Sequence, residues 1–282
     1  MFSQVVKTLL TKKQSSVEDK IETLHRTCFL YFFQLLGIKE DDEATLDTLF
    51  GFLKSNKKEL TKAQMDSIKF DAQFFTFNAP GPVKTKAQLA HLRAFKKFCK
   101  VLVSNIVDVF PSLQESMSGL VSEILKFTNC KLRLFRHGFT QIGLTIFNEL
   151  LVEGCKLQTL KVYFTGQRDK NEQERGRAIE LAIDFFLNKN AAKLGEELMV
   201  PRLVDSQDFI RKGVYDCISE LGPSELKLAC SMKKLQLISR LFKGINDEDA
   251  CVAAMQALQK ISMRIKVTED QAQRKALEKS FN

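Results

Sequence analysis

The sequence predicts an all-α fold built from antiparallel helix pairs, and three features of the 282-residue chain support this. Apolar residues recur every three or four positions over long segments, which is the period of an amphipathic helix. The five prolines, at positions 80, 82, 111, 201 and 223, stand between those segments and not within them. No sustained alternation of apolar and polar residues occurs, and the hairpin dipeptides Asn-Gly and Asp-Gly are absent. We therefore expect no β-sheet.

The apolar stripes place the main helices in order along the chain. They are Ile21, Leu24, Cys28, Tyr31 and Leu35; Leu92, Phe95, Cys99, Leu102 and Ile106; Phe139, Ile142, Gly143, Ile146, Phe147, Leu150 and Leu151; and Ile210, Val214, Cys217, Ile218 and Leu221. Residues 78–84, rich in Pro and Gly, are expected to form a loop. Asp205 and Ser206 are expected to cap the last of these helices, and Gly222 before Pro223 is expected to end it in the left-handed conformation.

The helix entrances repeat at an interval of about 40 residues. Arg211, which follows an acidic turn at Asp205, aligns with Val252 at a distance of 41 residues and with Arg133 at a distance of 78 residues. A degenerate copy spans residues 171–175. Such a period in helical pairs is typical of HEAT-type repeats. The predicted fold is therefore a HEAT-repeat-like α-solenoid of antiparallel helix pairs, in which Asp205 and Arg211 are expected to be structural.

This organisation divides the chain into three parts. We expect an N-terminal helical region over residues 1–78, HEAT-like repeats over 79–265, and a C-terminal helix or tail over 266–282. A hydrophobic content of 44% allows a large core, and no apolar run approaches the ~20 residues of a membrane span. The seven cysteines contain no Cys-x-x-Cys pair. They are expected to be buried thiols of a reducing compartment, either cytosol or nucleus.

The net charge of +9 is concentrated in one part of the sequence. Ten lysines and arginines but only three acids lie between Lys84 and Asn148. A concentrated positive field attracts polyanions such as nucleic acid. The alternative is a solvated helix face with acids elsewhere to balance it. The candidate DNA-binding residues are Lys84, Lys86, Arg93, Lys96, Lys97, Lys100 and Lys131.

The segment 131–137, Lys-Leu-Arg-Leu-Phe-Arg-His, places three cations and a histidine around one aromatic residue at a helix entrance. Arg133 and Arg136 are three residues apart and project from the same side of a helix that starts near Leu132. Two guanidinium groups and a ring could hold a carboxylate, a phosphate or an aromatic side chain. The alternative is that Phe135 fills the core and one arginine pairs with a neighbouring acid.

The usual signatures of catalysis are absent from the sequence. It contains no phosphate-binding Gly-rich loop, no Gly-x-Ser-x-Gly and no His-Glu-x-x-His. Its three histidines, His25, His91 and His137, do not predict a metal site, and His25 is expected to be a packing residue. The acids 41–43 are expected to complement a helix dipole. We therefore expect a protein without catalytic activity, cofactor or metal.

Several segments resemble the stromal antigen (STAG) family, the HEAT-repeat subunits of cohesin. Residues 132–140, Leu-Arg-Leu-Phe-Arg-His-Gly-Phe-Thr, resemble the family's Val-Arg-Ala-Phe-Arg-His-Thr-Ser-Thr segment. Residues 79–82 and 98–103 are similar to the family's Ala-Gly-Pro and Phe-Cys-Glu-Phe-Ile segments. Residues 199–205, 210–211 and 220–222 are similar to three further family segments, in the same order.

The resemblance implies a non-catalytic, chromosome-associated nuclear scaffold that supports sister-chromatid cohesion. Its implied partners are the kleisin subunit of cohesin, double-stranded DNA, and regulators that carry aromatic short motifs. The implied surface for such peptides comprises Arg133, Phe135, Arg136 and His137. The family's pocket also uses a tryptophan, whereas this chain has none, and His91 falls nearest to that position.

Two other functions remain open on the sequence alone. One is a generic α-helical-repeat adaptor that binds peptides or RNA. The other is an enzyme with a novel site, which would require a pocket lined by His91 and His137 together with acids.

Overall fold

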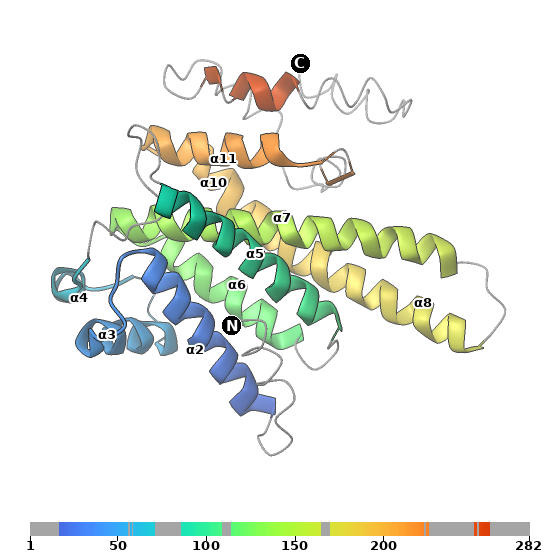
Figure 1. Ribbon diagram of the computed structural model, residues 1–282, viewed down its shortest axis with the longest axis horizontal. Coiled ribbons are helices and arrows are strands. Elements are labelled where there is room, and N and C mark those ends of the chain that lie inside the picture. Colours follow the sequence, from blue (N-terminus) through green and yellow to red (C-terminus); the bar gives the residue numbers. More distant parts are fainter. Residues whose placement is uncertain are drawn as a thin grey trace. The chain divides into compact units, whose positions relative to one another are not determined.

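The structure is a computed structural model, and it describes residues 17–70 without 56 and 58, 86–108, 114–164, 170–225 without 223, and 251–259 without 253. These residues are mostly helical, and none of them forms a strand (Figure 1). The all-α prediction is thus confirmed. The loop predicted at residues 78–84 and the tail predicted at 266–282 lie outside the described residues.

The helices group into two compact units that divide between Ile146 and Phe147. The first contains α2 (Val17–Leu35), α3 (Glu43–Lys54), α4 (Lys62–Ser67), α5 (Lys86–Asp108), α6 (Gln114–Thr128) and the first part of α7 (Arg133–Phe164). The second contains the remainder of α7, α8 (Lys170–Ile183), α9 (Ala192–Leu194), α10 (Val200–Arg202), α11 (Asp208–Glu220) and the helical residues around Met255. Between α8 and α10, Asp184–Ala191 and Gly195–Met199 are π-helical.

Phenylalanine side chains from α2, α3, α5, α6 and α7 form the core of the first unit. Phe127 stacks on Phe139 with ring centroids 4.4 Å apart, and Phe29 and Phe33 pack around them at 5.6–6.1 Å. Each such pair adds about 0.5–1.5 kcal/mol to the gain from buried area. Because α2 and α7 share this core, it joins residues from both sides of the boundary expected between residues 78 and 79.

The predicted stripes coincide with α2, α5, α7 and α11, whose stripe residues are largely buried. Helix α2 ends at Leu35 and is followed by Gly37, whose φ of 82° is the left-handed conformation that glycine favours. The N–H groups of Gly37 and Ile38 donate to the carbonyls of Gln34 and Phe33, which completes a Schellman motif. The N-cap of α3 is Asp42, whose side chain accepts a hydrogen bond from the Thr45 N–H, and Glu43 lies in the first turn of the helix. Asp42 and Glu43 thus lie at the N-terminal end of α3, where the helix dipole favours acidic side chains.

His25 occupies the packing position expected from the sequence. Its Nδ1 lies 3.2 Å from Oε2 of Glu123 on α6, and its side chain is only 16% exposed. A Cβ at Gly119 would lie 2.8 Å from His25 Cε1, so the glycine makes room for the ring. The pair therefore joins α2 to α6.

The caps predicted for α11 are wrong. Its N-cap is Gln207, and its C-cap is Leu221 in an extended conformation, not a left-handed Gly222. The Asp205 carboxylate instead accepts hydrogen bonds from Arg202, at 2.8 Å, and from the Gln207 N–H. The guanidinium of Arg211 donates to the Asp205 backbone carbonyl at 2.7 Å. Both Asp205 and Arg211 therefore shape the turn between α10 and α11.

Close helix packing in the second unit depends on small residues. A Cβ at Gly154 of α7 would lie 2.7 Å from Leu187 Cγ in the first π-helical segment. On another part of α7, Asn148 Oδ1 accepts a hydrogen bond from the Cys217 thiol of α11. Lys161 and Glu180 join α7 to α8 with an exposed ion pair at 3.0 Å.

Of the described helices, none has the length and apolar character needed to span a bilayer.

Candidate nucleic-acid interface

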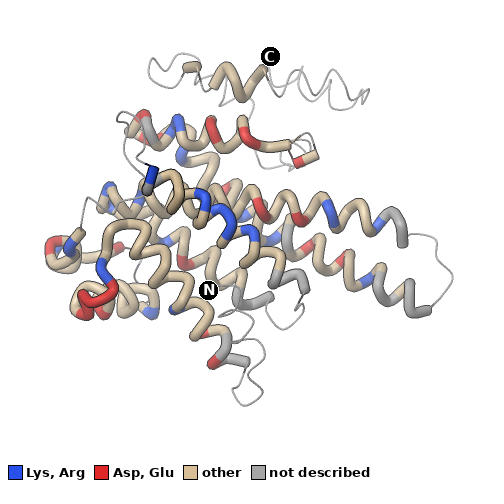
Figure 2. Tube along the Cα trace, in the orientation of Figure 1, with Lys and Arg blue, Asp and Glu red and all other residues tan. Residues whose placement is uncertain are grey.

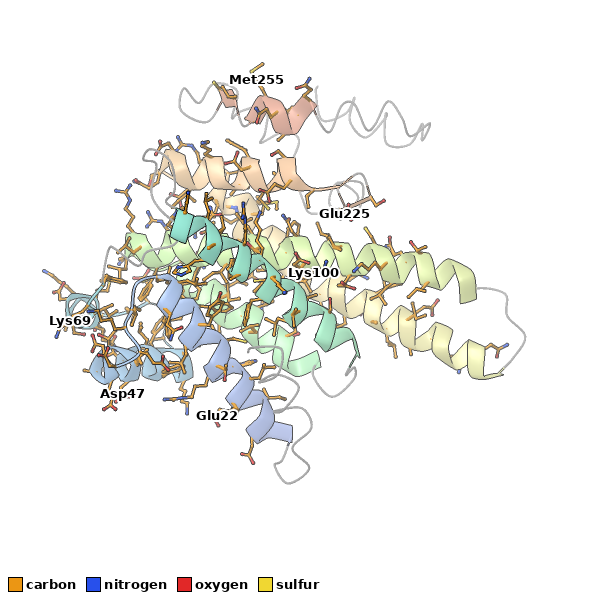
Figure 3. The ribbon with its side chains drawn as sticks, viewed as in Figure 1. Glu22, Asp47, Lys69, Lys100, Glu225 and Met255 are labelled. Carbon is orange, nitrogen blue, oxygen red and sulfur yellow. The ribbon has the colours of Figure 1, made fainter. Side chains whose placement is uncertain are left out.

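Five exposed cations lie along α5 and form what we call the α5 basic stripe, namely Lys86, Arg93, Lys96, Lys97 and Lys100. At 3.6 residues per turn, positions 86, 93, 97 and 100 share one face of the helix, with Lys96 beside them. At 1.5 Å per residue, this face extends over about 21 Å. Figure 2 shows the cations along α5, and Lys100 is labelled in Figure 3.

The opposite face of α5 fixes the direction of the stripe. Phe95 and Phe98 are buried and contact Phe32 of α2 with ring centroids 6.4 and 6.0 Å apart. Phe98 also contacts Tyr31 at 4.7 Å. Because these rings belong to the aromatic core, α5 cannot rotate without breaking it. The cations are therefore held on the outer face of the helix.

The sequence of α5 leaves its positive charge uncompensated by its own acids. From Lys86 to Val107 the helix contains no Asp or Glu, and Asp108 is its last residue. Five like charges within ~21 Å repel one another and raise the local positive potential. A bound polyanion would relieve that repulsion.

Two of the predicted DNA-binding residues differ from the other five. Lys84 lies outside the described residues. Lys131 precedes α7 and forms an ion pair with Glu59, with Nζ and Oε2 2.9 Å apart. The hydrogen bond that Lys131 donates to the Glu59 carboxylate raises the pKa of Lys131, so the lysine stays charged to higher pH.

Phe135 belongs to the core and not to an exposed peptide-binding surface. Its side chain is fully buried, with ring centroids 5.2 Å from Phe127, 5.4 Å from Phe70 and 6.3 Å from Phe33. The assignment of Phe135 to a partner surface is therefore corrected in favour of the packing alternative. A peptide cannot reach this ring unless the core opens.

The neighbours of Phe135 differ in accessibility. Arg133, the first residue of α7, is exposed, Arg136 is half-buried, and His137 is only 5% exposed. His137 is therefore poorly placed for direct contact with a partner. Thr140 donates a hydrogen bond to the Arg136 backbone carbonyl within α7. Of the cations of the 131–137 segment, Lys131 and Arg133 are exposed and Arg136 is half-buried.

His91 is exposed on α5 but does not lie on the basic stripe. It precedes Phe98 by seven residues, so helical geometry places it on the side of the helix that carries Phe98. Within the described part of the chain, no three His, Cys, Asp or Glu side chains are grouped as metal ligands.

Sequence reasoning missed two residues that shape this part of the first unit. Glu59, which holds Lys131, is 72 residues distant in the sequence. Lys126, counted above only as one of ten cations, is half-buried and donates to the backbone carbonyls of Leu53 and Ser55. Neither pairing leaves a local sequence signal, because each joins segments more than 70 residues apart.

Neither the models of protein families nor the curated proteins include a match to the chain.

Proposed function

We propose that the protein is a non-catalytic, cohesin-associated scaffold of HEAT-like solenoid architecture that binds double-stranded DNA and the kleisin subunit. The observation that carries the DNA-binding part is the α5 basic stripe, five exposed cations held outward by a buried aromatic face. The kleisin-binding part, the support of sister-chromatid cohesion and a nuclear, chromosome-associated location rest on the stromal antigen resemblance, which runs from about Cys28 to Ile261.

The stripe suits a phosphate backbone better than it suits base recognition. Duplex DNA carries one negative charge per ~1.7 Å of its axis. The α5 basic stripe, which is ~21 Å long, therefore lies opposite several phosphates. Arg93 is the one guanidinium of the stripe, and the stripe contains no Asn or Gln to read base edges. We therefore propose binding that is independent of DNA sequence.

The salt dependence of duplex binding tests this proposal. If each of the five cations neutralises one phosphate, the logarithm of the association constant falls with the logarithm of salt concentration with a slope of about −4.5. Fluorescence anisotropy with two 20-base-pair duplexes of unrelated sequence, over a series of salt concentrations, measures the slope and the sequence dependence. Binding that is insensitive to salt, or restricted to one duplex, contradicts the proposal.

Purification of the tagged full chain from cells tests the cohesin part separately. Recovery of the kleisin and the other cohesin ring subunits after treatment with a DNA-specific nuclease supports it, since DNA no longer bridges the proteins. If instead RNA and unrelated peptides are recovered, the chain is a generic helical-repeat adaptor. The α5 basic stripe suits the backbone of RNA as well, so duplex DNA and RNA should be compared in the binding assay.

A further inference from the structure

Lys131, just before α7, forms an exposed ion pair with a residue from another segment. Its Nζ lies 2.9 Å from Oε2 of Glu59, which belongs to the segment between α3 and α4. Both side chains are exposed, Lys131 to 71% and Glu59 to 49%. An external anion can therefore reach the pair from solvent.

An external phosphate and the Glu59 carboxylate compete for the same ammonium group. The pairing with Glu59 raises the pKa of Lys131, so the lysine is cationic whichever anion holds it. An exposed pair of this kind is weak, because solvent and salt screen it. A polyphosphate has a higher charge density than one carboxylate and can displace it. While Glu59 is present, however, it both occupies the lysine and repels the incoming phosphate.

The surroundings of Lys131 favour an anion. Arg133 is exposed two residues later and begins α7, a helix of 32 residues. The N-terminal end of a long helix carries a partial positive charge. The first turn of α7 contains no acid, so Glu59 comes from a distant segment to supply the negative charge.

We propose that Glu59 restrains polyanion binding by holding Lys131, as a competitor built into the fold. This inference rests on the proposed DNA-binding function and adds a regulation to it. Removal of the Glu59 carboxylate releases Lys131 and strengthens binding. If the ion pair had only a structural role, removal of the Glu59 carboxylate would weaken polyanion binding or leave it unchanged.

The chain offers a matched control in a second exposed ion pair. Lys54 Nζ and Glu22 Oε1 are 2.8 Å apart, with side chains 71% and 67% exposed, and they join α3 to α2. Neither residue belongs to the predicted interface. Glu59→Gln and Glu22→Gln each raise the net charge by one, but the first releases Lys131 and the second releases Lys54.

The experiment measures the affinity of the full chain for a 20-base-pair duplex by fluorescence anisotropy over a series of salt concentrations. Glu59→Gln is expected to bind about two- to fivefold more tightly at low salt, which corresponds to the loss of a competing surface pair. Its salt slope is expected to be steeper by about one. Glu22→Gln is expected to match the wild type. In a Lys131→Gln background, Glu59→Gln is expected to lose its effect.

Each other outcome overturns the inference. If Glu59→Gln binds as the wild type does, while the wild type binds DNA with a steep salt dependence, Glu59 does not restrain the interface and the proposed function stands. If Glu22→Gln strengthens binding equally, the gain is a general effect of net charge. If the wild type binds no duplex, the inference falls together with the proposed function. Far-ultraviolet circular dichroism and thermal unfolding verify that each variant is folded.

Discussion

Lys126 stabilises the end of a helix to which it does not belong. From α6, its Nζ donates hydrogen bonds to the backbone carbonyls of Leu53, at 2.8 Å, and Ser55, at 3.0 Å. The last carbonyls of a helix have no partner within the helix, and a cation there also complements the helix dipole. Sequence reasoning could count Lys126 as a positive charge, but only the tertiary fold shows which backbone atoms it contacts.

Replacement of Lys126 by methionine should lower the free energy of unfolding by about 1–2 kcal/mol. The apolar stem is preserved, while two carbonyls at the end of α3 lose a charged donor. Urea denaturation followed by circular dichroism measures the change. Lys100→Met, at an exposed position of α5, serves as the control and should change stability by less than about 0.5 kcal/mol. Equal stability of the two variants would show that the contact contributes nothing.

Tyr31 should make stability depend on pH in the alkaline range. Burial raises the pKa of Tyr31 to about 12, from an ordinary value near 10. Because the folded state holds the Tyr31 proton more tightly than the unfolded state does, the protonated tyrosine contributes to the free energy of unfolding. This contribution is complete below pH ~10 and is lost as pH rises toward 12. Tyr31→Phe cannot ionise, so its unfolding free energy should fall less steeply over that range. Urea denaturation at pH 9, 10 and 11 compares the two proteins, and identical slopes would exclude the effect.

At the scale of elements, the local period of apolar residues was sufficient to locate the main helices. The stripes of α2, α5, α7 and α11 were predicted because a helix depends on residues three or four apart. Local signals did not predict the π-helical turns after α8, where Asn190 is buried and donates a hydrogen bond to the Phe185 carbonyl five residues earlier. They also misplaced the N-cap of α11, because Asp205 contacts Arg202 of the preceding helix.

Two glycines in helices should respond to alanine with opposite signs. Alanine favours a helix over glycine by up to about 1 kcal/mol. At Gly51 of α3 a Cβ has nothing within 4 Å, so Gly51→Ala should stabilise the protein by this amount. At Gly154 a Cβ would overlap the buried Leu187 side chain. Overpacking costs about 1–3 kcal/mol, so Gly154→Ala should destabilise by up to about 2 kcal/mol.

Urea denaturation of both variants decides this prediction. Stabilisation by Gly154→Ala would mean that Leu187 moves aside without cost and that the α7 contact is not close-packed. A loss of stability in Gly51→Ala would contradict the open surroundings of that glycine.

At the scale of the whole molecule, the structure shows which surface carries the exposed cations of α5, and composition alone does not. The shared helix face of Lys86, Arg93, Lys97 and Lys100 follows from their local spacing once the helix bounds are known. The sequence left two alternatives open for Phe135 and did not predict the pairing of Lys131. The burial of Phe135 depends on Phe33 of α2 and Phe127 of α6, and the pairing of Lys131 depends on Glu59. The set of candidate residues is therefore smaller than the sequence predicted. It is centred on the α5 basic stripe and includes Arg133 as a further exposed cation.

Reversal of the stripe charge tests the central claim most directly. The variant Lys86→Glu, Arg93→Glu, Lys97→Glu and Lys100→Glu is compared with a control in which Lys39, Lys57, Lys62 and Lys69, all exposed in the first unit, are changed to Glu. Both variants have the same net charge, and their affinity for duplex DNA is measured at one low salt concentration. The account predicts that only the stripe variant loses binding, by at least about a hundredfold. Equal affinity of the two folded variants would contradict it.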